Sequence, residues 1–144
     1  MSHSHPSCLL PVVVGAHLRA EMGDRPSAYA LRERLASIAE GEGVRLAPVV
    51  VTDLWYLNQD VLRVRPTVSV GNPEINALSA ALASRLPSAL AIDDRLLVQF
   101  DPEWTDQVAC CWGVDHQATA RAAGIFAERY AQAFVRAAAR ITPG

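Results

Sequence analysis

The chain contains no lysine, because all 13 of its basic residues are arginines. This absence excludes Schiff-base chemistry and the phosphate-binding loop of the P-loop type, both of which require a lysine ammonium group. The net charge is −2 at pH 7, and the arginines are scattered along the chain. The sequence therefore lacks the basic patch that attracts nucleic acid, and we expect no nucleic-acid partner.

Several motifs that carry chemistry are also missing. There is no G-x-G-x-x-G, no G-x-S-x-G nucleophile elbow, and no set of His, Asp and Glu with metal-ligand spacing. The three cysteines include the adjacent Cys110 and Cys111 in an apolar run, without C-x-x-C spacing. We expect no metal and no cofactor. Successive strand side chains alternate, so we expect these two thiols to be buried above and below a sheet.

Long hydrophobic runs are absent as well. No segment reaches the ~18 apolar residues of a membrane span, and the first residues lack the charged start and apolar core of a signal peptide. Free buried cysteines are typical of a reducing compartment. We therefore expect no membrane association, and a bacterial protein located in the cytoplasm.

Apolar runs and amphipathic stretches alternate along the chain. The runs predict strands at Leu9–Val14, Leu46–Val51, Thr67–Val70, Ser88–Ile92, Leu96–Phe100 and Val108–Gly113. The stretches predict helices at Pro26–Glu40, Leu54–Gln59, Pro73–Leu86 and from His116 to about Ile141. This alternation predicts an α/β fold, a three-layer α/β/α sandwich with a mostly parallel sheet of about five or six strands.

Other segments have weaker patterns. Leu18–Arg25 is expected to be a loop or lid, and Asp60–Arg65 a connection. The strands on either side of Asp93-Asp94 are expected to pair as a hairpin, with Leu96–Phe100 antiparallel at an edge. Residues 1–8 are expected to form a disordered tail. His3 and His5 could bind a metal, but a disordered terminus is the favoured interpretation. Residues 9–144 predict a single α/β domain.

The segment from Pro66 to Leu86 reads as a strand, a tight turn and a helix. We expect Asn72 to cap the helix and Pro73 to occupy its first position. Ile75, Leu78 and Leu82 are spaced three or four residues apart and would form one apolar stripe. The final strand and helix follow the same pattern, with Asp115 as the expected cap.

Ligands of open α/β sheets bind outside the carboxyl ends of the strands. The candidate acid–base residues at these ends are His17, Asp53 and His116. The candidate ligand-binding residues are Gly71, Asn72, Asn76, Asp115 and Thr119. Each has a structural alternative, because Asp and Asn commonly cap helices and loop histidines are commonly solvated. The sequence leaves these alternatives open.

Two stretches resemble a domain of some prokaryotic S-layer-type surface proteins. The first is V-V-V-T-D followed by a strand and G-N-P-E-I-N-A-L, similar to the family's G-G-P-x-x-N, with Asn72 in place of the second glycine. The second is C-W-G-V-D-H-Q-A-T-A-R-A-A, similar to a strand-Gly-x-x-x-x-x-T-x-x-A turn. The resemblance covers roughly the C-terminal two thirds. It implies an α/β fold with Gly71, Pro73, Asn76 and Thr119 at turns, and no catalytic residue.

Two functions follow from these observations. The first is a small non-catalytic module that acts by self-association as a homo-oligomer or by docking a protein partner. A mean hydropathy of +0.13 and three tryptophans suit a buried interface. The alternative is a small-molecule enzyme, a hydrolase or transferase, that uses His17, Asp53, Asn72 and His116. A histidine that reaches Asp53 in a concave pocket would favour catalysis, whereas side chains that cap helices would not.

Overall fold

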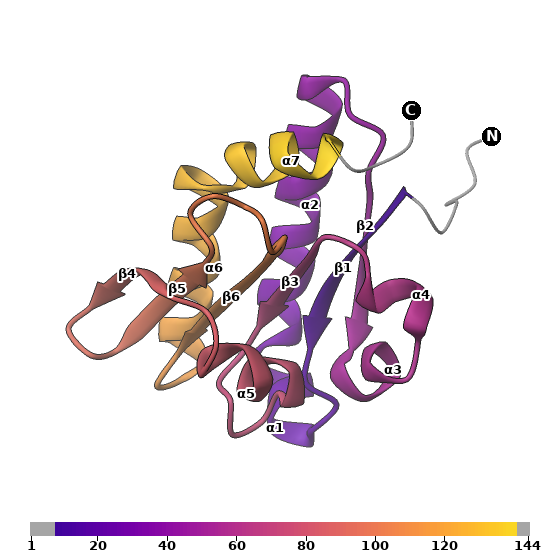
Figure 1. Ribbon diagram of the computed structural model, residues 1–144. Coiled ribbons are helices and arrows are strands. Elements are labelled where there is room, and N and C mark those ends of the chain that lie inside the picture. Colours follow the sequence, from indigo (N-terminus) through magenta and orange to yellow (C-terminus); the bar gives the residue numbers. More distant parts are fainter. Residues whose placement is uncertain (1–7, 141–144) are drawn as a thin grey trace.

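The computed structural model describes residues 8–140 of the chain (Figure 1). The predicted tail, with His3 and His5, therefore lies outside the described residues except for Cys8. Six strands form one sheet in the order β2-β1-β3-β6-β5-β4. Their bounds are β1 (Leu9–Val14), β2 (Ala47–Thr52), β3 (Thr67–Val70), β4 (Ser88–Ile92), β5 (Leu96–Phe100) and β6 (Val108–Gly113). The predicted strands are confirmed, with a shift of one residue at β2.

The sheet is mixed rather than mostly parallel, which corrects the sequence-based expectation. Strands β2, β1, β3 and β6 are parallel neighbours, whereas β5 is antiparallel to β6 and β4 is antiparallel to β5. Asp93 and Asp94 both have positive φ, 50° and 53°, as a tight hairpin turn requires. The chain therefore returns directly, without a helical crossover. The hairpin is confirmed, but β4 and not β5 lies at the edge.

Within the described residues, helices separate β1, β2, β3 and β4 along the chain and follow β6, whereas no helix separates β4, β5 and β6; the α/β fold is confirmed. The helices are α1 (Leu18–Gly23), α2 (Arg25–Glu42), α3 (Asp53–Leu57), α4 (Asp60–Arg63), α5 (Ala77–Ala83), α6 (His116–Arg129) and α7 (Ala131–Ala139). Val12 and Val14 of β1 belong to one buried cluster with residues of α2, α6 and α7. Val13 belongs to a second cluster with residues of α3, α4 and α5. Alternating strand side chains thus contact two separate cores.

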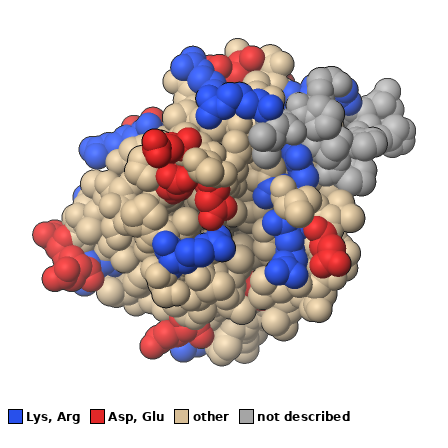
Figure 2. All heavy atoms as spheres, in the orientation of Figure 1, with Lys and Arg blue, Asp and Glu red and all other residues tan. Residues whose placement is uncertain are grey.

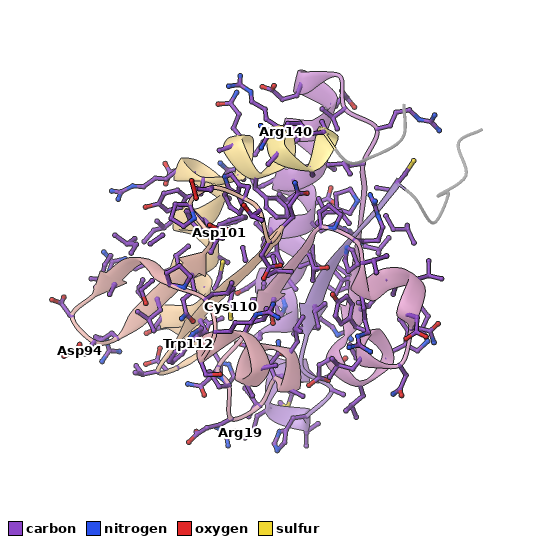
Figure 3. The ribbon with its side chains drawn as sticks, in the orientation of Figure 1. Arg19, Asp94, Asp101, Cys110, Trp112 and Arg140 are labelled. Atoms are coloured by element: carbon purple, nitrogen blue, oxygen red, sulfur yellow. The ribbon has the colours of Figure 1, made fainter. Side chains whose placement is uncertain are left out.

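The adjacent cysteines follow the same alternation. Cys110 lies in the cluster that contains Val13, and Cys111 lies in the larger cluster with Val12. Both are fully buried and neither forms a disulfide. The prediction that the two thiols lie on opposite faces of the sheet is confirmed; Figure 3 labels Cys110 near the middle of β6.

Two segments expected to be irregular are helical. Residues of the predicted loop Leu18–Arg25 form α1, and Asp60–Arg63 forms α4. Helix α1 has too few residues for an apolar period to be visible. It depends on a cap from His17, which accepts a hydrogen bond from the amide of Arg19 (3.0 Å), and on the burial of Ala20. Tertiary contacts and one cap therefore decide the conformation there.

The predicted closing helix is two helices that meet at Tyr130. This residue has φ −123° and ψ −18°, outside helical geometry. The ring of Tyr130 contacts Phe100 with centroids 4.9 Å apart, and Phe134 of α7 contacts Trp104 at 5.4 Å. These aromatic contacts explain why α7 turns across the end of α6 (Figure 1). None of the helices in residues 8–140 has both the length and the apolar character that a membrane crossing requires.

Candidate functional site

All eight candidate site residues lie at the end of the sheet where the parallel strands have their carboxyl ends. We call this end of the sheet the carboxyl edge, which is distinct from the edge strands β2 and β4. Strands β1, β2, β3 and β6 run parallel and end there, at the bottom of Figure 1, where α1, α3 and α5 also lie. The parallel strands bring together residues that are far apart in the sequence, as expected. What decides the chemistry is the set of partners that each side chain has at this edge.

Asp53 is 4% exposed and joins three loops. Its Oδ1 accepts hydrogen bonds from the amides of Ala16 (2.9 Å) and Leu54 (2.7 Å). Its Oδ2 accepts a hydrogen bond from the amide of Ala77 at 2.7 Å, in the first turn of α5. Both carboxylate oxygens are therefore engaged by backbone donors, and Thr52 rather than Asp53 caps α3.

His17 lies close to Asp53 along the edge but has a different partner. Its Nδ1 accepts the hydrogen bond from Arg19 that caps α1. Within residues 8–140, no hydrogen bond joins an imidazole to Asp53. The histidine–aspartate arrangement that would have favoured catalysis is therefore not formed by this pair.

Asn76 occupies the crevice between the ends of β1 and β3. It is 1% exposed, and its Nδ2 donates to the carbonyls of Val13 (3.2 Å) and Val70 (2.9 Å). Its Oδ1 accepts from the amides of Leu78 (3.0 Å) and Ser79 (3.1 Å), which caps α5. The crevice is the topological switch point at which open α/β sheets bind ligands. Here a side chain of the chain itself fills it.

The start of α5 differs from the expectation. Asn72 caps a short turn instead: its Oδ1 accepts from the amide of Glu74 (2.8 Å), and its Nδ2 donates to the carbonyl of Gly113 (2.9 Å). Pro73 precedes the helix by four residues. Ile75 joins the cluster opposite the one that holds Leu78. The apolar stripe is thus divided between the two cores.

Gly71 has a φ of 130°, which side chains rarely adopt. A Cβ at this position would lie 2.9 Å from Oδ2 of Asp24. The glycine is therefore explained by the backbone and by the close approach of a buried carboxylate. Its role as a ligand-binding residue stays a prediction.

Asp115 and Thr119 support the start of α6. The Oδ1 of Asp115 accepts from the amide of Ala118 (2.8 Å), and its Oδ2 forms an ion pair with Arg95 (3.1 Å). The Thr119 hydroxyl accepts a hydrogen bond from the amide of Gly113 at 3.0 Å. Asp115 is confirmed as the cap of α6, and both residues connect the end of β6 to this helix.

Asp24 and His116 form a pair that the sequence did not indicate. Nδ1 of His116 lies 2.8 Å from Oδ1 of Asp24, although the residues are 92 positions apart. The Asp24 side chain is 1% exposed, and the His116 side chain is 45% exposed. The imidazole covers Gly23, where any side chain would collide with it. No local pattern could reveal the pair, because Asp24 lay in a segment expected to be a loop.

The Asp24 carboxyl is in an unfavourable position for a charge. Burial raises its pKa, and the hydrogen bond and charge of His116 offset part of that increase. Its Oδ2 has no hydrogen-bond partner among the described residues. Chemically, a carboxylate that orients an exposed imidazole can support proton transfer. Within residues 8–140, no hydroxyl or thiol forms a hydrogen bond with His116, whose imidazole is paired with the Asp24 carboxylate.

An open depression of about 550 Å³ lies beside these loops. Its lining includes apolar groups from Leu54, Pro73 and Ile75, as well as His17 and Asp53. Both oxygens of Asp53 already accept backbone hydrogen bonds, whereas Glu74, which also lines the depression, is exposed. The large apolar side chains exposed to solvent at this end of the sheet are Leu18, Met22, Leu54, Trp55 and Val114.

Within the described part of the chain, no group of three or more His, Cys, Asp and Glu side chains could hold a metal ion. A scan against protein-family models found no match, and a search of curated proteins found no significant similarity.

Proposed function

We propose that this protein is a non-catalytic α/β module that acts by self-association or by docking a protein partner. The observation that carries the proposal is the position of Asn76. Its amide bridges the carbonyls of Val13 and Val70, so the crevice that would receive a ligand holds part of the chain. A binding site for a small molecule has free, convergent polar groups, and the side-chain amide of Asn76 in this crevice is already paired on both its nitrogen and its oxygen.

The surface around the crevice supports protein binding. Leu54 and Trp55 at the start of α3 are 59% and 52% exposed, and Leu18 and Met22 of α1 are 70% and 75% exposed. Exposed tryptophan beside a depression is typical of the residues that dominate protein interfaces. We define the carboxyl-edge surface as Leu18, Met22, Leu54 and Trp55, and we propose that it contacts a protein partner.

The same proposal includes the setting of the module. We infer a single domain over residues 9–144 with a three-layer α/β/α arrangement, supported by the two buried clusters and by the helices that contribute to each. Three free buried cysteines support a reducing, cytoplasmic location in a bacterium. The resemblance to S-layer-type domains stays a prediction, and we propose no lattice role from it.

Native mass spectrometry of the untagged protein from its own host tests the proposal. We expect a homo-oligomer or a complex with a second protein, and no stoichiometric small molecule. The double variant L54E/W55E should lose a partner that docks at the carboxyl-edge surface. Val64 is 76% exposed at the end of α4, so V64E is the matched control and should retain it. A bare monomer at every concentration, or a chain that carries one small molecule, would contradict the proposal.

The second candidate is a small-molecule hydrolase or transferase, favoured by one observation. His116 is exposed and its imidazole is oriented by the buried Asp24 through the 2.8 Å contact. Under this hypothesis, the protein would cleave generic ester or phosphoester substrates, and His116→Ala would abolish that turnover. His17→Ala serves as the comparison, because His17 is also an edge histidine but caps α1. No turnover by the wild-type protein would remove this candidate.

A further inference from the structure

The contact between Asp24 and His116 holds an imidazole in one orientation at the surface. Nδ1 of His116 lies 2.8 Å from Oδ1 of Asp24, whose side chain is 1% exposed. The ring also covers Gly23, where an added Cβ would collide with three of its atoms. A buried carboxylate at its edge and the backbone against its face therefore fix the position of the ring.

This contact decides which ring nitrogen faces solvent with a lone pair. A carboxylate that accepts a hydrogen bond from Nδ1 keeps the proton on that nitrogen, so Nε2 is unprotonated in the neutral ring. Within residues 8–140, Nε2 of His116 has no hydrogen-bond partner, and 45% of the side chain is exposed. The pair therefore presents a free nitrogen lone pair to solvent.

The imidazole is itself the nucleophile in this arrangement. In a Ser-His-Asp site the imidazole takes a proton from a neighbouring hydroxyl. Among the described residues, no hydroxyl or thiol is bonded to His116. Histidine can also form the covalent bond in a group-transfer reaction. The carboxylate at Nδ1 then stabilises the positive charge that develops on the ring when Nε2 attacks.

The surroundings favour transfer of a negatively charged group. His116 is the first residue of the 14-residue helix α6 and lies at the positive end of its dipole. The neighbouring Asp115 is ion-paired with Arg95 (3.1 Å). On α1, Glu21 is ion-paired with Arg25 (3.0 Å). Figure 2 shows acidic and basic side chains interspersed over the visible face of the described residues. A phosphoryl group has the charge that a helix N-terminus stabilises.

We propose that His116 is a phosphoryl-acceptor site, modified on Nε2 by a donor that carries its phosphoryl group on a protonated nitrogen, with Asp24 as the positioning residue. The Nε2 lone pair forms the new N–P bond. The N–P bond of the donor breaks with its electron pair on the donor nitrogen, which leaves as a neutral amine or imidazole. The Nδ1 proton passes to Oδ1 of Asp24.

Asp24 is suited to accept this proton, because burial raises the pKa of its carboxyl. The dipole of α6 selects the charge of the transferred group, and the Asp24–His116 contact supplies the nucleophile. The site goes beyond the proposed docking function and does not depend on it.

Phosphoramidate, a small donor of this class, tests the assignment at about pH 8, where phosphohistidine is not lost to acid. Peptide mass spectrometry should find the phosphoryl group on His116, and phosphorus–proton correlation spectra should place it on Nε2. His17 is the internal comparison: it is also exposed, but its Nδ1 accepts the amide of Arg19, so its Nε2 carries the proton. His116 should react at least about tenfold faster than His17.

Asp24→Asn separates the charge of the carboxylate from its hydrogen bond. The amide oxygen can still accept a hydrogen bond from Nδ1, but it cannot take the proton. The rate at His116 should fall by about tenfold or more, and the rate at His17 should not change. Glu21→Gln is the matched control, because it removes an exposed carboxylate of α1 that is paired with Arg25. Its His116 should react as in the wild type, and circular dichroism should show that both variants are folded.

Three results would overturn the assignment. They are a rate at His116 no greater than that at His17, a phosphoryl group on Nδ1 of His116, and an Asp24→Asn rate equal to the wild-type rate. The docking function is tested separately by L54E/W55E, which leaves Asp24 and His116 in place. A failure of either proposal is therefore distinguishable from a failure of the other.

Discussion

Asp24 is the residue whose chemistry depends most on the folded state. It lies between α1 and α2, is 1% exposed, and approaches both Gly71 and His116. A buried carboxylate oxygen without a partner costs free energy of folding, about 1–3 kcal/mol as a general magnitude. The contact with His116 offsets part of this cost. Burial remains the larger effect, so the pKa of Asp24 is raised.

This raised pKa makes a prediction about stability and pH. The folded chain binds the Asp24 proton more tightly than the unfolded chain, so the contribution of Asp24 to stability falls as pH rises above the unfolded value of 3.8. The free energy of unfolding of the wild type, minus that of Asp24→Asn, should therefore decrease from about pH 3.5 to about pH 7. Urea denaturation at several pH values measures this difference.

The partner of Asp24 also titrates, so the comparison needs a control. Repeating the pair of measurements in a His116→Gln background removes the imidazole from the pH dependence. The difference should still decrease with pH in this background, because burial of the carboxyl is the largest cause of its raised pKa. A difference that increases with pH in both backgrounds would mean that the folded state favours the ionised carboxylate.

Short elements in this chain depend on individual polar side chains. Helix α5 has seven residues, too few to be stable alone. Its start is set by Asn76, which makes four hydrogen bonds, and by Asp53, which accepts from the amide of Ala77. Asn72, by contrast, closes a turn and reaches Gly113 through one side-chain donor. The two asparagines are therefore expected to contribute differently to the free energy of unfolding.

We expect Asn76→Ala to lower the free energy of unfolding by about 2–4 kcal/mol, because it removes the cap of α5 and leaves two strand carbonyls unpaired. Asn72→Ala is the matched control and should cost about 1 kcal/mol, since its contacts are partly exposed. Urea denaturation at pH 7 compares the two variants with the wild type. A larger loss of stability in Asn72→Ala than in Asn76→Ala would contradict this assignment and would favour a helix that begins at Pro73, as the sequence suggested.

At the scale of the whole molecule, the sheet separates two buried clusters. Cys110 and Cys111 lie at this boundary, one facing each cluster. Burial raises the pKa of the Cys110 thiol to about 12, although a hydrogen bond with Ser79 lowers it, and burial also raises the pKa of the Cys111 thiol well above its usual value. The two thiols therefore report on the integrity of both cores at once.

We expect both thiols to resist labelling in the native protein. At pH 8, a thiol of pKa about 12 is ionised in roughly one molecule in ten thousand, and the reagent must also enter the core. Labelling followed by peptide mass spectrometry should show modification of Cys110 and Cys111 only at the rate of global unfolding. Guanidinium-denatured protein is the control, in which both should react at once. Rapid labelling of the native protein would contradict the burial of β6.

The sequence by itself determined the strands, the hairpin and the edge of the sheet at which the polar residues gather. These features depend on local properties: apolar runs of strand length, the tolerance of Asp93 and Asp94 for positive φ, and the shared direction of parallel strands. The opposite burial of Cys110 and Cys111 followed from the same alternation.

Only the tertiary structure decided which partners the polar side chains at the carboxyl ends of the strands have. Helix α1, the start of α5 at Asn76 and the break at Tyr130 depend on contacts between segments far apart in the chain. The pairing of Asp24 with His116 spans 92 residues, and the carboxylate of Asp53 reaches two loops besides its own. A side chain forms hydrogen bonds with residues distant in the sequence only when the packed core brings them within reach. Residue types alone therefore could not show whether the polar side chains at the carboxyl ends of the strands are catalytic or only support the loops and helix starts.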